Sequence, residues 1–319
     1  MPETRTMKSR RPSRVLLSTL ALSAVALSSP PSTISSIAQK EVTQAEYLQS
    51  LMDSGQRSIE VILKAFEPHF PSSKRHLLNS EKVYVSPHSS FTAYADYNSQ
   101  KILIPVQVVL EAHLQAHAYI YVENDPSAAP QFNPYLQYLS ERSNDVFIRI
   151  RKGEIAGDDL PIKSFWIFAN LPPPKFKDGD KDVIAKLMTS SLATVVGHEL
   201  GHLALEHKPY KDITLEQSRQ QEFDADAFAV RLIHSAGESV IPGLLTIYLR
   251  FVTSEHLLQG AKVEAGTHPA AICRLYRMFK KEYDVLRNTP AGKNLLESRS
   301  GMTLEQVDSL MDQTKESCS

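Results

Sequence analysis

A motif of two histidines and one glutamate inside an apolar run constrains this chain more than any other feature of its sequence. His198 and His202 are four residues apart, Glu199 follows the first histidine, and β-branched residues and leucines flank the motif. If the run is helical, residues i and i+4 share a face, so both imidazoles can reach one ion. The pattern H-E-x-x-H is typical of sites in which two histidines bind zinc beside a glutamate base. Because a catalytic zinc site has three protein ligands and one open position, one ligand remains to be found.

A second predicted helix offers candidates for the third ligand. Residues 214–217 read Thr-Leu-Glu-Gln, the form of a capping box that begins a helix, and Gly237 is a suitable end. Glu222 and Asp226 are four residues apart on this helix and therefore share a face. One carboxylate can bind the metal while the other accepts the free N–H of a ligating histidine. Because two exposed acids at this spacing repel each other slightly, a cation between the helices explains the pair.

Three motifs in this order resemble a known group of enzymes. The segments His198–His202 and Glu222–Asp226 resemble those of the gluzincin metallopeptidases, most closely the family of HtpX-type and CAAX-prenyl endopeptidases. Thr267-His268-Pro269, followed by Arg274, is similar to that family's His-Pro segment and its downstream arginine. The resemblance covers about residues 183–287. The best-known members are integral membrane enzymes, but no segment after the N-terminus of this chain is apolar enough to span a membrane. The chain therefore resembles the soluble, exported branch of the family.

The resemblance implies a role for each residue and one zinc ion per chain. Glu199 would be the catalytic base, Asp226 would support a ligand from behind, and His268 would lie near the active site as an oxyanion donor. The implied activity is that of a zinc endopeptidase acting on a peptide or an unfolded protein. The alternative is a zinc-stabilised chaperone or assembly factor with a blocked or latent site. The implied zinc ligands are His198, His202 and Glu222.

The expected fold class is α+β, a mostly helical zincin-like domain with a small antiparallel sheet. After residue 38 we expect a single domain, with residues 39–182 as its N-terminal part and residues 183–319 as its helical zinc-binding part. Residues 83–85, 91–97 and 101–104 are predicted to be strands, and the last two would form a hairpin. Its exposed edge can pair with an extended peptide beside the metal; the alternative is an ordinary structural hairpin.

The long stretch between this hairpin and the metal helix, residues 105–182, is expected to be an insertion. It can serve as a lid, as a rim that contacts substrate, or as a propeptide-like inhibitory segment. The amino-acid composition does not distinguish these three roles. Within it we expect a helix over residues 106–122 that carries a second i, i+4 histidine pair, interpreted as partly exposed rather than metal-binding. The apolar runs 147–150 and 165–168 are predicted to be strands.

The N-terminus has the order of a secretory signal peptide over residues 1–38. Residues 8–14 are basic, residues 15–27 are mostly apolar, and the following segment is rich in small residues up to Ala38. The apolar run is shorter than the roughly 20 residues of a membrane span, so we expect cleavage, with an uncleaved anchor as the alternative. The expected location is outside the cytoplasm, periplasmic or secreted, and the mature chain is expected to be soluble.

The charge of the chain bears on its partners, and its cysteines bear on disulfide formation. The formal net charge is −1 at pH 7, with acidic and basic residues mixed throughout, so no nucleic-acid partner is expected. The chain has two cysteines, Cys273 and Cys318. An oxidising compartment permits one disulfide between them; the alternative is a buried Cys273 and a free thiol in the tail.

Overall fold

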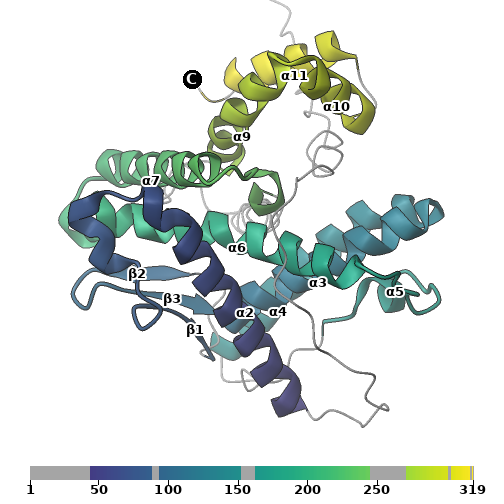
Figure 1. The fold of residues 1–319 in the computed structure, drawn as a ribbon, viewed down its shortest axis with the longest axis horizontal. Coiled ribbons are helices and arrows are strands. Elements are labelled where there is room, and N and C mark those ends of the chain that lie inside the picture. The colour runs from purple at the N-terminus through teal and green to yellow at the C-terminus, as the bar shows by residue number, and fades with distance from the viewer. Residues whose placement is uncertain are drawn as a thin grey trace, which may run out of the picture.

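Helix α6 (Asp180–Ala204) lies at the centre of the fold, with a three-stranded sheet on one side (Figure 1). The computed structural model describes residues 44–87, 93–151, 162–244, 271–300, 303–316 and 318. The other α-helices in these ranges are α2 (Gln44–Phe66), α3 (Val106–Asn124), α4 (Phe132–Arg151), α5 (Phe165–Phe168), α7 (Leu215–Ser235), α9 (Ala271–Arg287), α10 (Pro290–Ser300) and α11 (Leu304–Glu316). Short 3-10 helices are η1 (Glu67–His69), η2 (Ser72–Leu77), η3 (Pro126–Gln131) and η4 (Tyr210–Asp212). The predicted class, a mostly helical α+β domain, is confirmed.

The sheet contains β1 (Val83–Ser86), β2 (Tyr94–Asp96) and β3 (Lys101–Pro105) in the order β1-β3-β2. Strands β2 and β3 form the predicted antiparallel hairpin. Strand β1 pairs with β3 in parallel, which makes the sheet mixed rather than purely antiparallel. Within the described part of the chain, β2 pairs only with β3 and so lies at the edge of the sheet nearest α6 (Figure 1).

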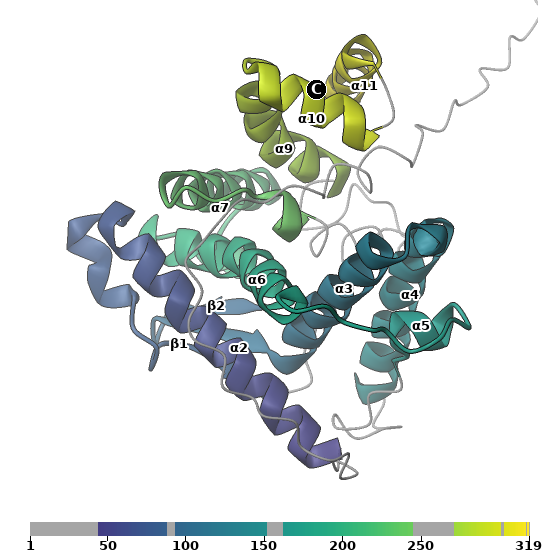
Figure 2. The same cartoon turned by 45° about the vertical axis from the view of Figure 1, so that its right-hand side comes forward.

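Helix α6 is buried because helices cover it on several sides. It packs against α2, α3 and α7, and Figure 2 shows α2 and α3 passing close to it while α7 runs beside its second half. Val196 and Leu200 are completely buried in the main apolar core. Asp180 and Asp182 occupy its first turn, where negative charge is favourable to the helix dipole. The HExxH motif therefore lies on a rigid, enclosed helix.

Helices α6 and α7 approach closely because small residues face each other. A Cβ built on Gly201 would lie 3.0 Å from the Ala225 Cα, and one built on Gly197 would lie 3.2 Å from the Ala229 Cα. Both contacts are with backbone, which cannot move aside as a side chain can. The missing Cβ atoms thus let the acidic face of α7 come near the histidines of α6.

Gly201→Ala is expected to destabilise the protein by roughly 1–3 kcal/mol, because the added methyl group overpacks the contact between the two helices. Urea unfolding measures the change. Alanine is a better helix former than glycine by about 1 kcal/mol, so without the clash the same substitution would stabilise α6. The exposed position 185 of the same helix provides the control, since Ala185→Gly reports helix propensity alone. A Gly201→Ala protein more stable than wild type would contradict the packing interpretation.

Two segments predicted to be strands are helical, so those predictions were wrong. Residues 147–150 continue α4, which begins at Phe132, and residues 165–168 form the single turn α5. Short apolar runs do not distinguish a strand from a buried helical turn. In α5, tertiary packing favours the helical turn over a strand, because the buried Phe165 ring makes edge contacts with Tyr121 of α3 and Tyr135 of α4.

The stretch from 105 to 182 begins with a core helix. Helix α3 is buried along most of its length and packs against α6, so it is an integral part of the domain. Its histidines, His113 and His117, are partly buried, and their ring centroids lie 4.3 Å apart. Within the described ranges, no third potential ligand joins them. They are therefore interpreted as packing residues.

Near the C-terminus, α9, α10 and α11 pack against one another (Figures 1 and 2). Cys273 in the first turn of α9 forms a disulfide with Cys318, just after α11, with the two Cα atoms 5.3 Å apart. Of the two alternatives for the cysteines, the structure has the disulfide.

The signal peptide predicted over residues 1–38 and the predicted oxyanion donor His268 lie outside the described residues. None of the described helices combines the length and the apolar character needed to cross a bilayer.

Candidate metal centre and active site

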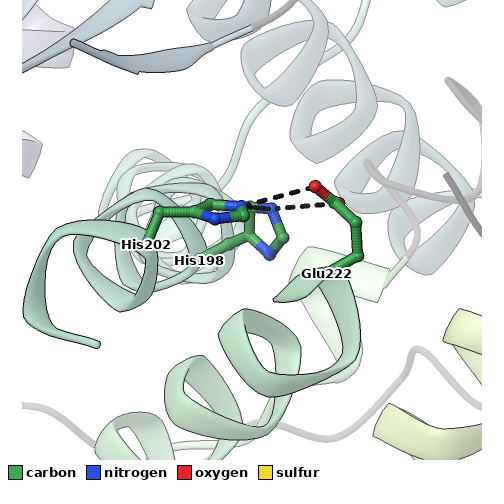
Figure 3. Close-up of side chains that lie close together, drawn as sticks. All are labelled: His198, His202 and Glu222. Atoms are coloured by element: carbon green, nitrogen blue, oxygen red, sulfur yellow. Dashed lines mark hydrogen bonds and ion pairs between the residues drawn. The ribbon is translucent and has the colours of Figure 1, made fainter. Parts of the chain in front are cut away.

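His198, His202 and Glu222 converge between α6 and α7, as Figure 3 shows. The two histidine Nε2 atoms lie 3.1 Å apart. Each is 3.5 Å from an oxygen of the Glu222 carboxylate. One ligand atom from each residue can be chosen so that all lie within 4.8 Å of one another, close enough to bind a single metal ion. Among the described residues, this is the only such group of three or more.

Asp226 holds the ring of His198 from the side away from this group. Its Oδ1 lies 2.9 Å from His198 Nδ1. A carboxylate at this distance accepts a hydrogen bond from Nδ1–H, which assigns the hydrogen to that nitrogen and leaves the Nε2 lone pair facing Glu222. The helical spacing left open which acid would do this, the family resemblance implied Asp226, and the structure places Asp226 there.

His202 is oriented in the same way by a residue that the sequence analysis did not single out. Its Nδ1 lies 2.9 Å from Nδ1 of His207, three residues after the end of α6. Burial, followed by the neighbouring His202, lowers the pKa of His207 to about 4, so its ring is neutral and can accept a hydrogen bond. His202 then donates from Nδ1 and keeps its Nε2 lone pair free.

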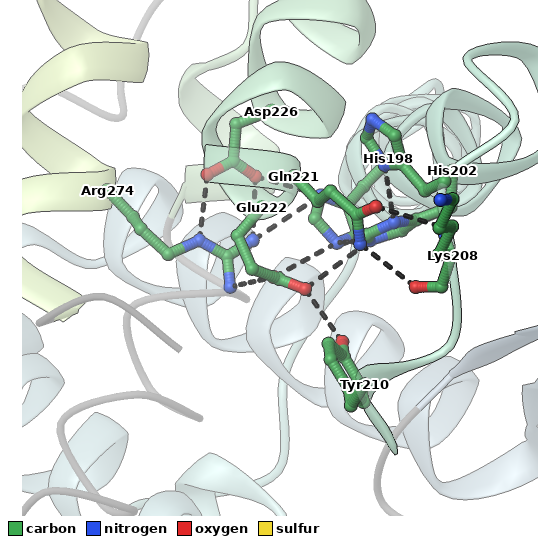
Figure 4. Close-up of polar contacts among 9 residues, drawn as sticks. His198, His202, Lys208, Tyr210, Gln221, Glu222, Asp226 and Arg274 are labelled. Atoms are coloured by element: carbon green, nitrogen blue, oxygen red, sulfur yellow. Dashed lines mark hydrogen bonds and ion pairs between the residues drawn. The ribbon is translucent and has the colours of Figure 1, made fainter. Parts of the chain in front are cut away.

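Arg274 of α9 balances the negative charge behind the ligands (Figure 4). It donates two hydrogen bonds of 2.7 Å to the two oxygens of Asp226, and its Nη1 lies 2.9 Å from Oε2 of Glu222. Burial alone would raise the pKa of Asp226, but the charge and hydrogen bonds of Arg274, helped by His198, lower it to about 2. A single guanidinium thus contacts the carboxylates of both Glu222 and Asp226 and fixes their positions, and it keeps Asp226 ionised.

Glu199 is buried beside the histidines at 8 % exposure. Burial raises its pKa and the charge of Glu222 adds to this, while His198, Arg274 and a hydrogen bond accepted from the Ala95 backbone act in the opposite direction. A buried carboxylate with a raised pKa holds a proton more readily than an exposed one, as a general base requires. Because Ala95 belongs to β2, this contact also joins the sheet edge to the motif.

Two tyrosines lie on the side of the site near η4 and β2. The Tyr210 hydroxyl donates a 2.7 Å hydrogen bond to Oε1 of Glu222. Burial and the Glu222 charge raise the pKa of Tyr210, and burial followed by Glu199 and Glu222 raises that of Tyr97 to about 12. Both phenols therefore keep their protons at neutral pH and can donate hydrogen bonds.

The structure brings together the five residues that the sequence analysis singled out on α6 and α7, which are His198, Glu199, His202, Glu222 and Asp226, and it adds His207 and Tyr210. His207 and Tyr210 lie in the short connection between α6 and α7. A polar residue in that connection is necessarily close to both helices, and this is the sequence signal that could have identified them. Arg274 was identified only as part of a family motif, without a function.

The comparisons with known proteins support the class of a peptidase. A family model described as Peptidase U49 matches residues 159–290, which is less than half of the chain but includes α6, α7 and α9. The specific family named from the motifs, the HtpX-type endopeptidases, is not the one that matches. No curated protein and no solved structure matches the chain.

Proposed function

We propose that this chain is a zinc-dependent endopeptidase that hydrolyses exported or unfolded proteins. The observation that carries the proposal is the convergence of His198, His202 and Glu222, with Glu199 buried beside them. A purely structural metal site does not need an adjacent buried glutamate. The family match supports the peptidase class, while the metal and the substrate are our proposal.

The residues present suit zinc. Two imidazoles with their Nδ1 atoms hydrogen-bonded elsewhere, together with one carboxylate, are a typical ligand set for catalytic zinc. Arg274 offsets part of the negative charge of Glu222 and Asp226, so the site is less acidic than an oxygen-rich calcium site would be. When bound there, zinc would supply Lewis acidity, which lowers the pKa of a water molecule and polarises a carbonyl group.

Glu199 would move the protons in the reaction. In this proposal its carboxylate takes a proton from the attacking water and passes it to the departing amine. The hydrogen bond from the Ala95 backbone keeps the carboxylate in place between these steps. Tyr210, whose hydroxyl already lies at the edge of the site, would fix the orientation of Glu222.

Strand β2 would hold the substrate. It lies at the edge of the sheet and borders α6, and Tyr94 on this strand is 47 % exposed. An extended peptide that paired with this edge would run past Glu199, because Ala95 at the middle of β2 already contacts that residue. Backbone pairing does not depend on side chains, which favours unfolded segments of varied sequence.

The site of action would be the periplasm or the extracellular space, because residues 1–38 have the order of a signal peptide. The Cys273–Cys318 disulfide agrees with an oxidising compartment. The competing function, a zinc-stabilised chaperone or assembly factor with a latent site, requires metal binding without hydrolysis.

Removing the metal is expected to abolish cleavage of an unfolded protein such as casein, because both the attacking water and the scissile carbonyl depend on it. Treatment with 1,10-phenanthroline followed by dialysis should give inactive protein, and one equivalent of zinc should restore hydrolysis. Magnesium, added in the same way, is the control. Cleavage that survives complete metal removal would contradict a metallopeptidase, and one bound zinc without cleavage would favour the chaperone.

A further inference from the structure

The metal centre depends on a helix that comes late in the chain. Arg274 in the first turn of α9 is 3 % exposed and contacts Asp226 and Glu222, the two buried acids of α7. Its Nη2 also lies 3.4 Å from Nδ1 of His198. Arg274 therefore contacts Glu222, Asp226 and the ring of His198 (Figure 4).

The residue before Arg274 is half of the disulfide. Cys273 is buried and bonded to Cys318, so the first turn of α9 is covalently tied to the residue that follows α11. The covalent tie is thus one residue before Arg274, whose guanidinium contacts the two carboxylates. No other residue of the metal centre is so close in sequence to a cysteine.

Noncovalent contacts hold α9 farther along its length. Arg277 lies over the ring of Phe223 at 3.6 Å, and Glu282 is 2.7 Å from His234 at the far end of α7. At the end of α9, Arg287 pairs with Asp308 of α11. Reducing the disulfide would leave these contacts in place and release mainly the first turn, which carries Arg274.

We propose that the Cys273–Cys318 disulfide sets the metal affinity of the site by holding Arg274 against Glu222 and Asp226. Without the covalent tie, Arg274 must be ordered at the cost of its own conformational entropy. Whenever it leaves, two buried carboxylates lose their cation and the ligands lose their fixed positions. The inference deepens the proposed function, since it rests on the three-ligand site binding a metal ion.

Reduction is a two-electron step that a phosphine can carry out. The phosphine breaks the Sγ–Sγ bond and is oxidised to a phosphine oxide with an oxygen from water. Each cysteine becomes a thiol by gaining one of the two protons of that water. An exported chain would meet the opposite change, from thiols to disulfide, after leaving the reducing cytoplasm. The site would therefore gain its full metal affinity only in the compartment that the N-terminal sequence predicts.

The test compares zinc affinity in the full chain and in the Cys273→Ser/Cys318→Ser double variant. The double variant is preferable to reduction alone, because free thiols can themselves bind zinc. Competition with a chromophoric chelator measures the dissociation constant. We expect it to rise roughly 10–100-fold, the range seen when support of a metal ligand is lost. Arg274→Lys should show the same rise, because lysine keeps the charge but cannot bond both oxygens of Asp226.

A matched control removes a noncovalent contact between α9 and α11. Arg287→Gln removes the exposed pair with Asp308 and should leave zinc affinity unchanged. Cobalt substitution supplies a spectroscopic readout, since the visible bands of the cobalt-loaded double variant should differ from those of the oxidised wild type. Phosphine should leave the bands of the double variant unchanged.

Two results would overturn this inference. One is a folded double variant that binds zinc as tightly as oxidised wild type. The other is loss of helical circular dichroism in parallel with the metal signal, because the disulfide would then be a general stabiliser of the domain. Oxidised wild type without zinc affinity would contradict the proposed function itself, so the two failures are distinguishable.

Discussion

Glu199→Gln is expected to lower kcat for hydrolysis by about 10²–10⁴-fold while the protein keeps its metal, because general acid–base catalysis contributes on that scale. Glutamine has nearly the same shape as glutamate, and its amide oxygen can still accept the hydrogen bond from Ala95. It cannot take a proton from water. The loss should therefore appear in kcat, with little change in KM, since Glu199 is not expected to hold the substrate.

Zinc content decides how this result is interpreted. Both proteins should be compared at equal measured zinc, and the exposed Glu206→Gln, just after the end of α6, serves as a control for loss of a carboxylate in this region. A Glu199→Gln enzyme as active as wild type would exclude the proposed base. Equal zinc with no cleavage by either protein would favour the chaperone alternative.

Much of the site could be predicted because its residues lie at helical spacings on two helices. The positions of His198 and His202 on one helix face, and of Glu222 and Asp226 on another, follow from 3.6 residues per turn. The start of α7 at a capping box is also a local signal, and Thr214 and Gln217 form both predicted hydrogen bonds. Local rules were sufficient for these features because neighbouring residues determine them.

The remaining features depend on contacts between distant segments. Helical spacing alone did not distinguish Asp226 from Glu222 as the partner of His198 Nδ1, and only the family resemblance implied Asp226. The contact depends on the distance between α6 and α7, which close at Gly197 and Gly201. The role of Arg274 depends on how α9 returns to α7. The segment at 165–168 was mistaken for a strand for the same reason, since only the packing of Phe165 against α3 and α4 makes it a helical turn.

Glu222→Gln is expected to weaken zinc binding by more than about 100-fold, because it removes the charged ligand, whereas loss of a supporting contact typically costs 10–100-fold. The amide oxygen can take the place of Oε2 and accept from Arg274, and the amide NH2 can donate to the Tyr210 hydroxyl oxygen, so the metal-free protein should remain folded. Competition with a chromophoric chelator measures the change in affinity. The exposed Asp224→Asn on the same helix is the matched control and should bind zinc as wild type does.

Glu222→Ala separates the ligand role of this residue from its role in folding. It also loses the metal, but it removes the oxygen that accepts the hydrogen bond of the Tyr210 hydroxyl and one of the two carboxylates that pair with the buried Arg274. We therefore expect the alanine variant, and not the glutamine variant, to lose stability in the metal-free state, by about 1–3 kcal/mol in urea unfolding. Equal stability of the two variants would mean that these contacts form only when metal is bound. Wild-type zinc affinity in either variant would show that the third ligand is not Glu222, and Asp226 would then be the next residue of α7 to replace.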